Sequence, residues 1–291
     1  MSQERTAGPG LPPWIRERKL RLGDLHAVRA RLHGGGLATV CEEARCPNRS
    51  ECFGRGTATF LINGTVCTRR CGYCAVAHGR PAPLDPGEPA RLAAVAERMG
   101  LRHVVITSVD RDDLPDGGAG AFVECLDRLA ALSRPPAVEV LTPDFRGDMV
   151  QVDRILEAGP AVYNHNVETV PRLYREVRRS GRYEWALEVL ARVASGGGDV
   201  VPKSGLMVGL GETEAEVLGV LDDLASVGCR IVTIGQYLQP TPAQVPVARY
   251  WPPEAFAALE RHGAALGLEV IAGPFVRSSY RAEEAYLTVR S

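Results

Sequence analysis

The sequence predicts an α/β fold in which six strand–helix units form a parallel sheet that curves into a partial, open barrel. Short apolar runs alternate with longer amphipathic stretches from about residue 57 onward, and a polar or glycine-containing loop follows most of the runs. Strands separated by helices of this length pair in parallel through right-handed crossovers. Six units are two short of a complete eight-fold barrel, which favours an open one.

The apolar runs define the predicted strands, which are Thr57–Ile62, His103–Thr107, Val138–Leu141, Val162–His165, Gly205–Gly209 and Ile231–Ile234. The amphipathic stretches between them predict helices over Pro89–Met99, Ala121–Leu132, Met149–Glu157, Tyr183–Ala194 and Glu214–Val227. We therefore expect three parts: an irregular N-terminal extension (1–55), the barrel (56–250) and a C-terminal extension (251–291). The last part contains a predicted helix, Pro253–Leu266, and a short apolar run, Leu268–Ala272.

Six of the eight cysteines fall into two triplets, Cys41, Cys46 and Cys52, then Cys67, Cys71 and Cys74. A chain of 291 residues buries a large core and does not need disulfides to fold. Zinc is the main alternative, but zinc sites usually present paired C-x2-C hooks with four ligands. Three thiolates per group leave one corner of a cubane open, so the spacing favours two iron–sulfur clusters.

The second triplet begins five residues after the first predicted strand, where barrel enzymes carry their reactive groups. The other predicted strands also end in polar or flexible residues, and these are Ser108 to Asp110, Thr142, Asn164 to Glu168, Gly209 to Glu212, and Gln236. One rim of the barrel is therefore expected to be a catalytic mouth.

Composition excludes several classes of protein. The formal net charge is −1, which gives no support for nucleic-acid binding, and no apolar run approaches the roughly 18 residues of a membrane span. The residues after Met1 lead into Gly and Pro without an apolar export signal. We therefore expect a cytoplasmic enzyme without nucleic-acid or membrane partners.

The C-x3-C-x2-C loop after the first strand resembles that of the radical S-adenosylmethionine (SAM) superfamily. The segment from Cys41 to Phe53, with Cys41-Glu-Glu-Ala-Arg-Cys46-Pro-Asn, is similar to the auxiliary-cluster segment of the lipoyl synthase family. Further similar segments follow in the family's order, and they are 107–114, 164–169, 203–207 and 277–280. Gly72-Tyr73 and Ala75 depart from the Pro-Phe and Asp expected there, which affects local packing rather than the ligands.

The resemblance implies a [4Fe–4S] cluster on Cys67, Cys71 and Cys74 that binds SAM and yields an adenosyl radical. It implies a second [4Fe–4S] cluster, held by the first triplet and Ser278, that is consumed as sulfur donor. The implied reaction is sulfur insertion at C6 and C8 of an octanoyl chain. That chain is carried on a lysine of a 2-oxoacid dehydrogenase E2 domain or a glycine cleavage H protein. A ferredoxin or flavodoxin as electron donor and an iron–sulfur carrier protein are implied as further partners.

Other site residues are predicted from their positions alone. Glu168, with Asn164, is expected at the ribose of SAM, Lys203 at its carboxylate, and Gly209 near its methionine or adenine end. Each also has an ordinary structural interpretation, such as a loop carboxylate, a snorkelling lysine or a turn glycine. The Asp110–Asp113 charge run is interpreted as a solvated loop with only a minor role in the site. Arg178 and Arg179 are read as exposed helix charges or contacts to the carrier.

Two other functions stay open from the sequence. One is a different two-cluster radical enzyme, such as a methylthio- or biotin-type sulfur transferase, although the Ser278 motif and the order of the triplets disfavour it. The other is a zinc-stabilised binding module. Iron and acid-labile sulfide assays on anaerobically purified protein separate that module from both enzymes.

Overall fold

The structure is a computed structural model and describes residues 10–16, 37–39, 58–196 and 198–291. Seven strands form a parallel sheet in the order β2 (Ala58–Ile62), β5 (His103–Ser108), β6 (Ala137–Leu141), β7 (Val162–Asn164), β8 (Val201–Val208), β9 (Ile231–Gln236) and β10 (Glu269–Gly273). The short strand β1 (Ala38–Thr39) adds an antiparallel edge to β2. All six predicted strands are confirmed, and the apolar run at Leu268–Ala272 supplies the seventh, so the sheet continues past residue 250.

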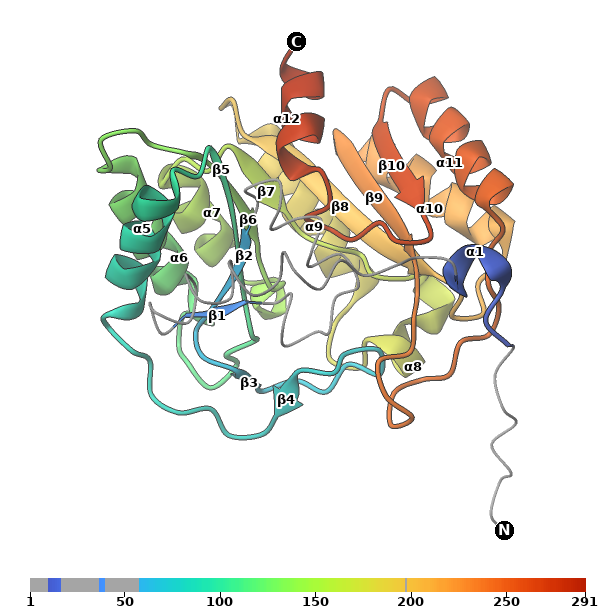
Figure 1. Cartoon of the computed structure of the whole chain (residues 1–291), viewed down its shortest axis with the longest axis horizontal. Helices are drawn as coiled ribbons and strands as arrows, with labels where there is room; N and C mark the ends of the chain where they lie inside the picture. The colour runs from blue at the N-terminus through green and yellow to red at the C-terminus, as the bar shows by residue number, and fades with distance from the viewer. Residues whose placement is uncertain (1–9, 17–36, 40–57, 197) are drawn as a thin grey trace.

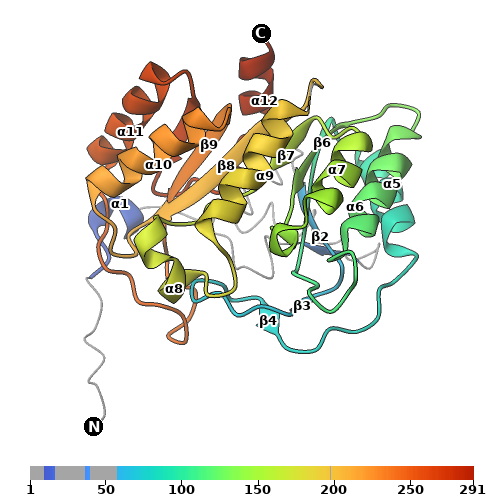
Figure 2. The same cartoon turned by 180° about the vertical axis from the view of Figure 1, so that it is seen from behind.

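Helices cover the outer face of the curved sheet in chain order, as Figure 2 shows from that side. They are α5 (Glu88–Met99), α6 (Ala119–Ala130), α7 (Met149–Glu157), α9 (Tyr183–Ser195), α10 (Glu214–Ser226) and α11 (Pro253–Ala265). Short helices α1 (Pro13–Arg16) and α8 (Tyr174–Val177) lie outside this layer. Two extended apolar clusters fill the space between helices and sheet, one under α5 to α7 and one under α9 to α11.

The helix α10 shows how the sequence sets these boundaries. Thr213 and Glu216 form a capping box, in which the Thr213 hydroxyl accepts from the Glu216 amide at 3.2 Å and a Glu216 carboxylate oxygen accepts from the Thr213 amide at 2.8 Å. This pairing satisfies amides that the first helical turn leaves without partners. The predicted start at Glu214 is therefore confirmed.

The two ends of the sheet have different coverings (Figure 1). At the carboxyl end of the strands lies the loop that contains β3 (Val66–Cys67) and β4 (Ala77–His78). At the opposite end, α12 (Ala282–Arg290) packs Ala285 against the starts of β7, β8 and β9. Ion pairs fasten α12 across this end, from Arg102 to Glu283 at 2.9 Å and from Arg290 to Asp199 at 3.5 Å. Among the described residues, α12 thus covers one end of the open barrel, and the cysteine loop lies at the other end.

Two helical glycines allow a matched test of the packing of the sheet against its helices. A Cβ on Gly263 of α11 would overlap the Val270 side chain of β10, whereas a Cβ on Gly219 of α10 would meet nothing within 4 Å. We expect Gly263→Ala to lower the free energy of unfolding by about 2 kcal/mol through overpacking. Gly219→Ala is expected to raise it by about 0.5–1 kcal/mol through helix propensity. Urea denaturation of both variants checks this, and equal effects in the two would contradict the packing of α11 on β10.

Candidate active site

A cavity of about 530 Å³ opens at the carboxyl ends of the strands. It brings together three cysteines from the loop after β2, Glu168 from the loop after β7, and Ser278 from the segment after β10. These residues are up to 211 positions apart in sequence, and Cys67 and Ser278 mark the two extremes. The predicted catalytic mouth is therefore where the parallel sheet places it.

The three cysteines of this loop fit a bound iron–sulfur cluster. Cys67, Cys71 and Cys74 are half-buried and line the same cavity. Burial raises the pKa of Cys67 to about 11 and that of Cys71 to about 12, and it also raises the pKa of Cys74. Without a metal these thiols hold their protons, so cluster binding must displace them.

The spacing of the ligands also bears on the kind of metal. Among the described residues, no three His, Cys, Asp or Glu side chains converge on a single metal ion. Zinc needs its ligands around one ion, whereas the cysteines of a cubane bind different irons and lie farther apart.

The departure at Gly72-Tyr73 has a local explanation. The Gly72 amide donates to the Val177 carbonyl at 2.8 Å, and its carbonyl accepts from Val245 at 2.9 Å. A Cβ at this position would lie 2.9 Å from the Glu176 carbonyl oxygen, so α8 can approach the loop only because residue 72 is glycine. Tyr73 also lines the cavity, and burial together with the nearby charge of Glu168 raises the pKa of its hydroxyl.

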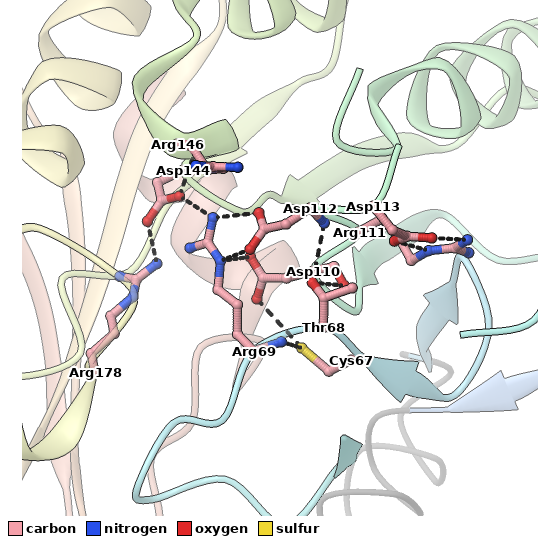
Figure 3. A network of polar contacts seen from close by, with 10 residues as sticks. All are labelled: Cys67, Thr68, Arg69, Asp110, Arg111, Asp112, Asp113, Asp144, Arg146 and Arg178. Atoms are coloured by element: carbon pink, nitrogen blue, oxygen red, sulfur yellow. Dashed lines mark hydrogen bonds and ion pairs between the residues drawn. The ribbon is translucent and has the colours of Figure 1, made fainter. Parts of the chain in front are cut away.

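A buried arginine fixes the cysteine loop to the strand ends (Figure 3). Arg69 lies between Cys67 and Cys71, and only 5% of it is exposed. Its guanidinium makes a bidentate pair with Asp112 at 2.8 and 2.9 Å and a third contact with Asp144 at 2.7 Å. Charged groups are buried at acceptable cost only when paired in this way, and the fork of arginine suits two carboxylates at once.

The Asp110–Asp113 run is therefore not a solvated loop. Asp110 lies 3.2 Å from Arg69 and accepts a hydrogen bond from the Cys67 thiol at 3.7 Å. Arg111 is 3% exposed and pairs with Asp113 at 2.9 Å. The interpretation from charge alone was wrong because the ends of parallel strands meet at one rim, where Asp110 and Asp112 find Arg69 of the cysteine loop as a partner.

Glu168 is held in an unusual backbone conformation. Its φ is +65°, in the left-handed region that residues other than glycine seldom adopt. Backbone hydrogen bonds to Gly205 at 3.0 Å and from Met207 at 2.8 Å fix it against β8. Burial raises the pKa of the Glu168 carboxyl, which accepts from Asn166 at 3.2 Å. Such a fixed, strained residue in a cavity is typical of a functional site.

Ser278 contacts the same asparagine. The Asn166 amide nitrogen donates to the Ser278 hydroxyl at 2.7 Å, while the Asn166 side-chain oxygen and the Ser108 hydroxyl have no hydrogen-bond partner among the described residues. Both of these residues line the cavity. Buried polar atoms without partners are costly, so the cavity fits a ligand that carries polar groups of its own.

Three predicted cofactor residues do not line this cavity. Lys203 is 1% exposed and pairs with Glu139 inside the barrel at 2.8 Å, and Asn164 donates to the same carboxylate at 3.0 Å. Burial alone would raise the pKa of Glu139, but the charge of Lys203 and its contacts bring it below the usual value. Gly209 has φ +103° and packs against Gln236 and the Arg249 carbonyl. Their assignments to SAM remain sequence-based predictions.

The remaining predicted residues divide between described and undescribed parts of the chain. Cys41, Cys46 and Cys52 lie outside the described residues. Arg178 is buried and donates to the Asn166 carbonyl at 2.6 Å, whereas Arg179 is exposed, so the two adjacent arginines have different environments. Arg69, Tyr73 and Asp144 were missed as site residues, and Asn166 was predicted only as part of the polar strand end from Asn164 to Glu168. The position of Arg69 between two ligand cysteines was the one signal for this group.

The comparisons with known proteins agree with this site. The family model of the radical SAM superfamily matches residues 62–224. A lipoyl synthase of Xanthomonas euvesicatoria is 53% identical over 277 residues, which cover 94% of this chain and 82% of the relative. A lipoyl synthase of Xylella fastidiosa is 52% identical over 94% of this chain and 74% of its own length. The chain belongs to the lipoyl synthase family.

Membership confirms the predicted radical SAM fold, with SAM and [4Fe–4S] clusters as its cofactors. Solved structures agree on the fold. Streptococcus suis SuiB bound to S-adenosylmethionine superposes with a TM-score of 0.56 at 11% identity, over 78% of this chain and about half of SuiB (53%). Methylornithine synthase (PylB) gives 0.54 at 14% identity, over 88% of this chain and 83% of that one. No helix in the described part of this chain is long and apolar enough to cross a membrane.

The Lys203–Glu139 pair offers a direct test of the role of Lys203. Lys203→Met leaves the buried Glu139 carboxylate without its partner, so we expect the free energy of unfolding to fall by about 3–5 kcal/mol. Adding Glu139→Gln removes the buried charge and is expected to restore most of that loss. Urea denaturation measures both effects.

The affinity of the double variant for SAM then shows whether Lys203 binds SAM or serves only as the partner of Glu139. Because the Lys203 ammonium is outside the cavity lining, we expect this affinity to be unchanged. A loss of about tenfold would show instead that Lys203 binds the SAM carboxylate.

Proposed function

We propose that this enzyme inserts two sulfur atoms, at C6 and then C8, into an octanoyl chain carried on a lysine of a partner protein. The observation that carries the proposal is the single cavity shared by the three cysteines of the loop after β2 and by Ser278. The 53% identity to a lipoyl synthase over 94% of the chain supports the same reaction.

The residues divide into two ligand sets. Cys67, Cys71 and Cys74 would hold one [4Fe–4S] cluster and leave one iron for the amino and carboxylate groups of SAM. The upstream triplet, Cys41, Cys46 and Cys52, would hold the second cluster together with Ser278. When bound, these groups supply a 5′-deoxyadenosyl radical and the sulfur to be inserted. The harder serine oxygen would make the weakest of the four iron bonds in the second set.

The protein's own part is to orient the reactants and exclude water. Glu168 presents a carboxylate fixed by β8 and by Asn166, a geometry suited to ribose hydroxyls. Apolar side chains also line the cavity, including Leu61, Leu141, Met207 and Leu238. They provide a surface for an alkyl chain and few competing hydrogen donors near a radical.

The implied partners are an octanoylated carrier domain, such as an E2 domain or an H protein, a ferredoxin or flavodoxin as reductant, and an iron–sulfur carrier that rebuilds the second cluster. We place the reaction in the cytoplasm, where thiols remain reduced.

The reaction is tested by anaerobic incubation of the reconstituted enzyme with an octanoyl-lysine peptide, SAM and a strong reductant. We expect mass spectrometry to show products with one and then two added sulfur atoms. Ser278→Ala is expected to abolish both products while 5′-deoxyadenosine still forms, because the three cysteines of the radical cluster are unchanged. Full product yield from this variant would disprove the role of Ser278.

The carrier protein is expected to contact the exposed Arg179 next to the cavity. Arg179 is exposed, makes no ion pair with another described residue, and follows the buried Arg178 directly. If an acidic carrier surface docks there, Arg179→Glu raises the KM for the carrier protein about tenfold through repulsion at the interface. The KM for the short octanoyl-lysine peptide serves as the control and is expected to stay the same. A parallel rise in both values would contradict a carrier contact.

A further inference from the structure

A continuous chain of polar contacts joins the cysteine loop to Ser278. It runs from Arg69 to Asp144 at 2.7 Å, and from Asp144 to Arg178 at 3.6 Å. Arg178 donates to the Asn166 carbonyl at 2.6 Å, and Asn166 donates to Ser278 at 2.7 Å. Figure 3 shows the first part of this chain, with Asp144 between the two arginines. No other residues are needed to connect the two halves of the proposed site.

Arg69, the first residue of this series of contacts, is part of the cysteine loop and is held firmly within it. Arg69 is two residues from Cys67 and two from Cys71, and its amide donates to the Cys67 sulfur at 3.4 Å. Its guanidinium is shared between Asp112 and Asp144, which follow different strands. A displacement of the loop would therefore separate a buried cation from both carboxylates, which is costly in a buried environment.

Asp144, at the centre of this series of contacts, has an arginine next to each of its two carboxylate oxygens. The Asp144 side chain is 1% exposed, and its Oδ1 contacts Arg69 while its Oδ2 faces Arg178. Burial would raise the pKa of Asp144, but the two arginines hold it at about 2. The next two residues, Phe145 and Arg146, both have positive φ values (45° and 57°), so the backbone here is confined to one turn.

The last member contacts both sides of the cavity. Asn166 donates to Ser278 and to Glu168, and it is 7% exposed. Gly205 of β8 leaves room for it, since a Cβ there would lie 2.9 Å from the Asn166 side-chain oxygen. Asn166 therefore has a fixed position from which it sets the location of the Ser278 hydroxyl.

We propose that Arg69, Asp144, Arg178 and Asn166 are positioning residues that fix the separation between the cysteine loop and Ser278. The inference rests on the proposed function, in which a radical formed at the cysteines must meet a carbon held beside a cluster bound by Ser278. An error of about 1 Å in such an arrangement can reduce the rate of reaction about a hundredfold. A rigid chain through the protein interior prevents that error.

The substitution Asp144→Asn tests the chain at its centre. It preserves the shape of the side chain but removes the charge that faces both arginines. In the full-length protein without clusters, we expect amide hydrogen exchange to rise about tenfold in two separate segments, 67–74 and 276–280. In the reconstituted enzyme, the ratio of 5′-deoxyadenosine formed to sulfur inserted is expected to rise about tenfold, because radicals form but miss the substrate.

A matched control breaks another buried ion pair at the same rim. Arg111→Gln removes the contact to Asp113 at 2.9 Å. Neither residue belongs to the series of polar contacts between Arg69 and Ser278. Exchange is expected to rise near residues 63 and 110–118, without change at 276–280 or in the product ratio. If Asp144→Asn fails to fold, Asn166→Ala cuts the last contact instead, and it is expected to raise exchange at 276–280 but not at 67–74.

The outcomes separate the two proposals. If Asp144→Asn changes exchange only at 67–74, or leaves the product ratio at the wild-type value, the positioning chain is refuted. If the wild-type enzyme inserts no sulfur, the proposed function is wrong. The exchange measurement on Asp144→Asn still decides whether segments 67–74 and 276–280 depend on the same series of contacts.

Discussion

The burial of the Arg69 guanidinium is the interaction on which the architecture of the site depends. A cation that is 5% exposed is tolerated only where carboxylates surround it, and here Asp110, Asp112 and Asp144 supply them. These acids follow two different strands of the sheet. The cysteine loop can therefore satisfy its arginine in one location only, which is against the rim of the barrel. The thiols are placed by electrostatics before any metal is bound.

A second buried ion pair has a comparable role deeper in the barrel. Lys203 of β8 and Glu139 of β6 meet across the interior, and His103 of β5 lies 3.8 Å from the same carboxylate. In complete barrels, layers of apolar side chains usually fill this space. Here a salt bridge spans strands that are not neighbours in the sheet, with β7 between them. It limits how far the open sheet can spread beneath the cavity, so the rim above keeps its width.

Much of this arrangement could be predicted, because the strands and the cysteine loop each depend on a short stretch of sequence. The strands were predicted from apolar runs, and the three cysteines that line the cavity were predicted as cluster ligands from their spacing. The predicted start of the strand around Lys203 was wrong, because β8 begins at Val201 rather than Gly205, which puts the lysine near the start of the strand and outside the cavity lining. Arg178 and Arg179 show what local sequence cannot predict. They are identical neighbours in the sequence, and only the packing of α8 decides that one is buried and the other exposed. No property of the two residues themselves distinguishes them.

The Gly72-Tyr73 pair indicates how the surroundings of a cluster site can change while its ligands stay constant. Proline at position 72 would lack the amide that bonds to Val177, and its ring would meet the Glu176 carbonyl oxygen. Glycine lets α8 and Val245 close over the loop from both sides. Tyr73 then lines the same cavity as Glu168, whose charge contributes to the raised pKa of the tyrosine hydroxyl. A phenylalanine at position 73 would bring no polar group into this part of the cavity. The two differences are therefore best understood together, because glycine allows the closer packing of the loop and tyrosine adds a polar group to the cavity that the loop lines.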